Sequence, residues 1–200
     1  LLLTPVFLVF LVTHAVMITM GILGHGTELP GMVRELHTDY QAGLGALGAF
    51  GMLRLFLHAY SLGGGTYTGI EAVSNGIAIM REPKVQTGRR TMIYMAASLA
   101  FTAGGILVCY LLFDVQTFFS LPAREQIGRT LNGVLAERFA SGWSLAGLPL
   151  GMVFAKLTIV WEAALLFAAA QTGFIDGPRV MSNMAIDSWL PHRFASLSDR

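Results

Sequence analysis

Polar residues in the middle of an apolar stretch are the most informative feature of this sequence. Thr68, Glu71 and Asn75 follow the i, i+3, i+7 spacing of one helix face, and Ser74 stands beside Asn75. An ionisable side chain inside a segment apolar enough to cross a membrane is by default a functional candidate. Glu71 could therefore bind a cation or carry a proton, and the stripe predicts a polar site that faces inward.

A glycine triplet, Gly63-Gly64-Gly65, precedes this stripe. Each glycine costs about 1 kcal/mol in a helix interior, so the triplet predicts a break near the middle of a membrane-spanning helix. Unwound backbone at that depth must be satisfied by protein, water or a ligand, and the two half-helix ends could hold a cation, an anion or a zwitterion. The alternative is that the glycines only allow close helix packing. The predicted binding residues are Gly64, Gly65, Thr66, Tyr67, Thr68, Gly69, Ser74 and Asn75.

Three ionisable residues within apolar runs are the candidates for proton coupling: Glu71, Glu162 and His14. Glu162 and Lys156 are six positions apart, about 120° around a helix, so they do not form an intrahelical pair. Each is expected to find a partner on another helix, and Glu71 with Lys156 is one such pair; snorkelling to the interface is the alternative for Lys156. A histidine titrates near neutral pH, although a lone one is more often a hydrogen-bonded core residue.

Other classes of chemistry find no support in the residue spacing. His14, His58 and Glu71 lack the spacing of a metal site, and the one cysteine, Cys109, lies in an apolar run. No Ser-His-Asp arrangement or paired carboxylates can be recognised. We therefore expect neither enzyme activity, nor a metal, nor a cofactor.

The composition indicates what kind of protein must position these residues. The 200 residues are 54% hydrophobic and only 12% charged, with a mean hydropathy of +0.61, whereas soluble chains carry about 25% charged residues. The net charge of +1 argues against nucleic-acid binding. We expect an all-α, polytopic membrane protein. Its predicted parts are spans at about 3–24, 50–80 (broken at 63–69), 91–113 and 147–172, an external amphipathic helix at about 125–140 and a cytoplasmic helix at about 178–188.

The distribution of basic residues predicts the orientation. Four of them, Arg81, Lys84, Arg89 and Arg90, lie within ten residues between the second and third spans, and such a short basic loop is typically cytoplasmic. Alternation then gives a first helix that runs outward and a cytoplasmic tail, as in a multi-pass protein of the plasma (inner) membrane. The sequence begins within an apolar run and stops in what reads as a loop, so we expect a segment of a longer membrane protein.

Five sequence patterns carry a resemblance to a known family: Gly69-Ile70-Glu71-Ala72, Ser74-Asn75-Gly76, Arg81-Glu82-Pro83-Lys84, Gly177-Pro178-Arg179-Val180 and Asp187-Ser188-Trp189-Leu190-Pro191. They resemble the amino acid-polyamine-organocation (APC) superfamily of transporters. The resemblance implies that the spans are helices five to eight of a LeuT-like core built from two inverted five-helix repeats, with the 125–140 helix lying outside between helices seven and eight. The subfamily pattern is similar to the branch of KimA-type proton-coupled potassium importers and to many amino-acid permeases.

The resemblance also implies roles for individual residues. Thr68 would be a substrate or ion ligand and Glu71 a proton-linked carboxylate, while His14 stands where some proton-coupled members have a lysine. The expected function is secondary transport of an amino acid or a potassium ion by alternating access around the broken helix. The transport is expected to be coupled to protons, and the protein is expected to be surrounded by membrane lipid. The amino acid and the potassium ion stay open at this point. The alternative functions are an ion channel and a membrane assembly subunit that does not transport. A homodimer is a possible oligomeric state.

Overall fold

The computed structural model describes residues 3–64, 73–74, 76–77, 80–144 and 147–196. These ranges are helical and contain no β-strand, as an all-α fold requires. Within these described ranges, four helices are long and apolar enough to cross a membrane. The elements are α1 (Leu3–Gly24), α2 (Leu29–Leu62), α4 (Lys84–Leu112), η3 (Val115–Ser120), α5 (Ala123–Gln126), α6 (Leu131–Phe139), α7 (Leu150–Ile186) and η4 (His192–Phe194).

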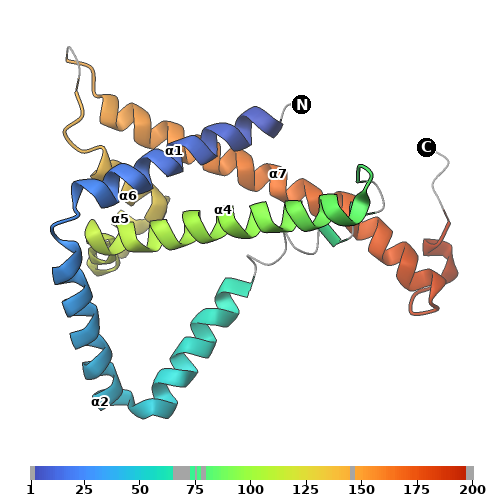
Figure 1. Ribbon diagram of the computed structural model, residues 1–200, viewed down its shortest axis with the longest axis horizontal. Helices are drawn as coiled ribbons and strands as arrows, with labels where there is room; N and C mark the ends of the chain where they lie inside the picture. The colour runs from blue at the N-terminus through green and yellow to red at the C-terminus, as the bar shows by residue number, and fades with distance from the viewer. Residues whose placement is uncertain (1–2, 65–72, 75, 78–79, 145–146, 197–200) are drawn as a thin grey trace.

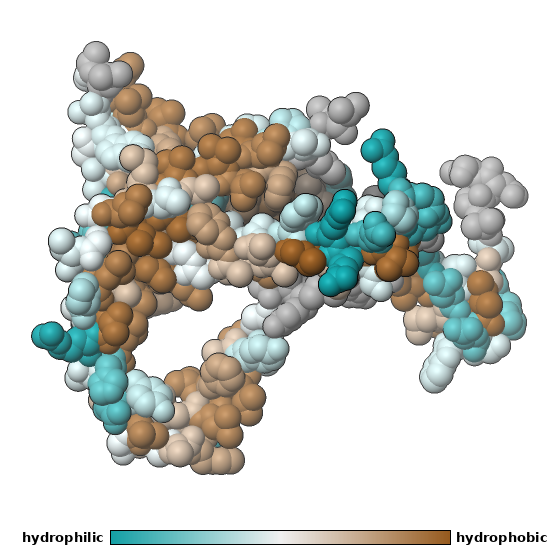
Figure 2. Space-filling view, viewed as in Figure 1, coloured by the Kyte–Doolittle hydropathy of each residue, from teal (hydrophilic) through white to brown (hydrophobic). Residues whose placement is uncertain are grey.

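Helices α1, α4 and α7 form a bundle, with α1 in contact with both of the others (Figure 1). Met17 and Ile18 of α1 are buried against a core that includes Cys109 of α4 and Ala155 of α7. Figure 2 shows that apolar side chains cover much of the visible face of this bundle, while hydrophilic ones gather toward the start of α4 and the end of α7. The helices thus bury a small core and present apolar surface outward, as membrane-spanning helices do.

Helix α2 departs from the expected bounds of the second span. It begins at Leu29, with Pro30 in its first turn, and no residue within it is buried. A kink divides it at Gly48, whose φ of 68° is in the left-handed region, and Figure 1 shows the resulting V-shaped path away from the bundle. A glycine reaches this conformation without the steric cost that a Cβ adds. The helix ends at Leu62, and Gly63 is its C-cap.

The segment expected to be one external amphipathic helix at about 125–140 differs from that expectation in two ways. It is divided into α5 and α6, because Gly128 has a φ of 76° and Thr130 is extended. The Thr130 side chain then accepts a hydrogen bond from the Gly133 backbone N–H at 3.1 Å, which caps the start of α6. Four consecutive residues of α6, from Gly133 to Ala136, are buried, because α6 packs against α7, α1 and η3. It is a core helix and not a surface helix.

The tail also differs from the expected arrangement of a span followed by a separate helix at about 178–188. Helix α7 continues through Pro178 to Ile186. A proline normally disfavours helical backbone at the preceding residue, because its ring clashes with that residue's Cβ. Here the preceding residue is Gly177, which has no Cβ, so that part of the clash is absent, while Pro178 still lacks the N–H that would bond to the carbonyl of Phe174.

A close contact between α1 and α4 gives a first testable prediction. A Cβ at Gly105 would lie 2.4 Å from Cγ2 of the buried Ile18, whereas a Cβ at the neighbouring Gly104 meets nothing within 4 Å. We expect Gly105→Ala to destabilise the intact protein by about 1–3 kcal/mol through overpacking. Gly104→Ala is the matched control and should leave the melting temperature in detergent unchanged or slightly higher, because alanine favours helix. Equal melting temperatures for the two variants would contradict the α1–α4 packing.

Candidate functional site

The histidine at the middle of α1 is fully buried and held by its own helix. Nδ1 of His14 lies 2.8 Å from the backbone oxygen of Phe10, one turn earlier. The Phe10 ring packs on the imidazole, with the two ring centroids 4.1 Å apart. A carbonyl oxygen only accepts hydrogen bonds, so Nδ1 must be the donor and carries a hydrogen. This contact directs Nε2 away from α1 and toward α7.

The partner of Nε2 is a carboxylate on α7. Oε1 of Glu162 lies 2.9 Å from Nε2 of His14. The Glu162 side chain is only 13% exposed, so the contact is largely shielded from solvent. The same oxygen accepts a hydrogen bond of 2.8 Å from Nδ2 of Asn132 on α6. Polar groups from two different helices therefore converge on one oxygen of Glu162.

A fourth residue completes the arrangement. The Tyr110 hydroxyl, near the end of α4, donates a hydrogen bond to Oδ1 of Asn132. Tyr110, Asn132, Glu162 and His14 thus form one continuous hydrogen-bonded chain, which we call the His14–Glu162 network. It joins α4, α6, α7 and α1, so any movement of one of these helices relative to the others must stretch or break a hydrogen bond.

The geometry of the central pair determines its proton content. With Nδ1 committed to the Phe10 carbonyl, two arrangements satisfy the contact between Nε2 and Oε1: an imidazolium with a carboxylate, or a neutral imidazole with a protonated Glu162. Both place one proton between the two atoms. Without this proton, the lone pair of Nε2 would face those of Oε1 at 2.9 Å, which is repulsive. A shared proton therefore favours the close contact of α1 and α7 at this point.

Only some of the site residues predicted from the sequence come together in the structure. It brings His14 and Glu162 together, and it supplies the partner on another helix that Glu162 was expected to need. Gly64 and Ser74 are described and exposed, and among the described residues no hydrogen bond joins either of them to the His14–Glu162 network. The remaining predicted residues, Gly65, Thr66, Tyr67, Thr68, Gly69, Glu71 and Asn75, lie outside the described residues.

Two members of the network were missed by the sequence analysis. Asn132 lies in a segment interpreted as a surface helix, where an asparagine is unremarkable. Tyr110 lies near the end of a span, where aromatic residues are common for interfacial reasons. The run Val134-Leu135-Ala136 after Asn132 was the available signal, because three consecutive apolar residues cover more of a helix than a surface helix exposes.

The donor set of the site does not resemble a metal centre. Within the described ranges, no group of three His, Cys, Asp or Glu side chains could hold a metal ion. The network consists of one imidazole, one carboxylate, one amide and one phenol, arranged donor to acceptor. Such an arrangement is suited to holding and moving a proton.

Comparison with known proteins gives one informative similarity. No protein-family model matches the sequence, and no solved structure gives a significant match. The potassium transporter KimA of Bacillus subtilis (strain 168) is 28% identical to the chain over 201 residues. The alignment covers 98% of this chain and 28% of the relative, so the chain spans less than a third of that relative's length. Along nearly its whole length, the chain is therefore similar to one part of a potassium transporter.

Proposed function

We propose that this chain forms part of a secondary transporter that moves potassium ions together with protons. Four helices able to cross a membrane and the similarity to a potassium transporter over 98% of the chain support a role in transport. The similarity also favours potassium over an amino acid as the cargo. In this proposal the spans belong to a LeuT-like core, in which transport proceeds by alternating access.

The observation that carries the proton part of the proposal is the 2.9 Å contact between His14 and Glu162. When the shared proton is present, α1 and α7 are held together at this point. When it leaves, repulsion between the facing lone pairs favours their separation. A ligand-dependent change in the packing of α1 against α7 would therefore change the affinity for the proton, and by linkage the proton would change the affinity for the ligand.

In the same proposal the cargo binds at the interrupted second span. Helix α2 ends at Leu62, so its last carbonyls and the negative end of its dipole lie at Gly63 and Gly64, where the glycine triplet begins. Carbonyl oxygens can replace the hydration shell of a potassium ion. Thr68 and Glu71 are the proposed side-chain ligands, and Glu71 compensates the charge of the cation.

The proposal is tested by uptake of radioactive rubidium, a tracer for potassium, into liposomes that contain the intact protein. We expect an inwardly directed proton gradient to drive uptake, external potassium to suppress it, and amino acids to leave it unchanged. Dissipating the gradient with a protonophore is the control and should abolish accumulation. Accumulation of an amino acid instead of rubidium would contradict the proposal. Rubidium uptake that does not depend on the proton gradient would contradict it as well.

A further inference from the structure

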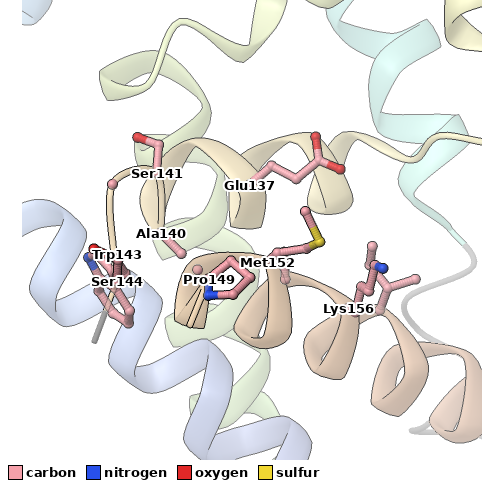
Figure 3. Close-up of a pocket in the computed structure, with 12 residues that line it drawn as sticks. Glu137, Ala140, Ser141, Trp143, Ser144, Pro149, Met152 and Lys156 are labelled. Atoms are coloured by element: carbon pink, nitrogen blue, oxygen red, sulfur yellow. The ribbon is translucent and has the colours of Figure 1, made fainter. Parts of the chain in front are cut away.

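A second feature of the structure lies at the other end of α6, away from the His14–Glu162 network. A cavity of about 450 Å³ lies between the end of α6, the loop that follows it and the first turns of α7. Figure 3 shows Ser141 and Ser144 toward one end of this cavity, Lys156 at the other, and Met152 and Glu137 between them. The lining thus combines hydroxyl groups, one cation and one anion with an apolar floor.

The charges of the lining leave one cation uncompensated. Glu137 is already paired with Arg129, which lies outside the cavity. Lys156 is exposed and has no ion-pair or hydrogen-bond partner within the part of the chain that the structure describes. The cavity therefore has a net positive character at its Lys156 end, and an anion of suitable size would be attracted there.

The neighbours of Lys156 on the outer face of α7 are apolar, as expected of a helix that can cross a membrane. Lys156 lies six residues after Leu150, the start of α7, which is about 9 Å along the helix axis. Val153, Leu157 and Val160 flank it on α7 and are each between 44% and 61% exposed. A lysine at this depth extends its ammonium group toward the level of the lipid headgroups. Trp143, at the other end of the cavity, is of the residue type that is enriched at that level.

We propose that this cavity binds the phosphodiester headgroup of an anionic phospholipid. The Lys156 ammonium pairs with the phosphate, Ser141 and Ser144 offer hydroxyl groups to a polyol headgroup, and the acyl chains lie along the exposed apolar face of α7. In the orientation predicted from the basic loop, this lipid belongs to the external leaflet. The occupant is a lipid and not a free anion, because the apolar face continues directly from the charged end of the cavity.

The test is native mass spectrometry of the intact protein, released from micelles that contain equal amounts of phosphatidylglycerol and phosphatidylcholine. We expect preferential retention of phosphatidylglycerol. Lys156→Gln should reduce this retention about tenfold, as expected for the loss of one charge-assisted hydrogen bond, and Lys156→Arg should restore most of it. Lys84→Gln is the matched control, because Lys84 is paired with Glu82 at the opposite end of the bundle, and it should have no effect.

Three results would overturn the proposal. Equal retention of the two lipids by the unchanged protein would remove the preference for an anionic headgroup, and this measurement does not depend on any variant folding. Equal loss of phosphatidylglycerol from Lys84→Gln and Lys156→Gln would show a general effect of charge. Complete displacement of the lipid by excess inorganic phosphate would indicate a free-anion site in place of a lipid site.

Discussion

Replacing Glu162 with glutamine should abolish rubidium accumulation driven by a proton gradient and leave rubidium exchange at equal pH intact. Glutamine preserves the size of the side chain and an oxygen that can accept from Asn132, whose hydrogen bond to Glu162 is 2.8 Å long. The Oε1 position contacts both Nε2 of His14 and Nδ2 of Asn132, so a glutamine cannot donate to Nε2 and accept from Asn132 through the same atom. An amide also cannot take up and release a proton as a carboxyl group does. The variant should therefore keep the size of the side chain and one of the two hydrogen bonds, and lose the carboxyl group that exchanges the proton.

The measurement compares two forms of transport in the same liposomes. Accumulation against a gradient requires proton coupling, whereas exchange of internal potassium for external rubidium requires only binding and alternating access. Glu125→Gln is the matched control, because Glu125 is an exposed carboxylate on the short helix α5. Normal proton-driven accumulation by Glu162→Gln would contradict the role proposed for Glu162. Loss of both transport modes would point to a structural role.

The second large effect concerns stability. His14→Leu should destabilise the intact protein by about 3–5 kcal/mol, the range found when one partner of a buried ion pair is removed. Glu162 is only 13% exposed, so its carboxylate would lose its partner in a poorly solvated place. The double variant His14→Leu with Glu162→Gln should recover much of this loss, because the remaining side chain is neutral and still accepts from Asn132.

This prediction is checked by thermal unfolding of the purified intact protein in detergent for the two single variants and the double variant. The interaction energy follows from the difference between the double variant and the sum of the single ones. A large coupling is expected, since the two side chains are in direct contact. Additive effects of the two substitutions would show that His14 and Glu162 do not interact energetically.

The sequence predicts the class of this fold well, because hydrophobic length is a strong signal. Long apolar runs with few charges indicate membrane-spanning helices directly. The bounds of the helices are harder to predict from the sequence. The start of α4 at Lys84 lies inside what reads as a basic loop, and the passage of α7 through Pro178 depends on the absence of a Cβ at Gly177. Both helix bounds depend on the local balance between helical and non-helical backbone, which the hydrophobicity pattern does not describe.

The candidate site is predictable in part. His14 and Glu162 are each conspicuous in the sequence, because an ionisable group in an apolar run needs a partner. Their pairing is not predictable in the same way, since 148 positions separate them and the packing of α1 against α7 decides it. The role of Asn132 is still harder to predict from the sequence, because it follows from the packing of α6 between other elements. The burial of α6 is a tertiary property, for which the apolar run Val134-Leu135-Ala136 is only an indirect sequence signal.

The central claim is that the proton held between His14 and Glu162 is exchanged in step with the binding of the cargo. The most direct measurement records the pH of a weakly buffered solution of the intact protein, with an indicator dye, when potassium is added. We expect a proton change that is present in the unchanged protein and in Glu125→Gln and absent in Glu162→Gln. A proton change of the same size in Glu162→Gln would contradict the claim.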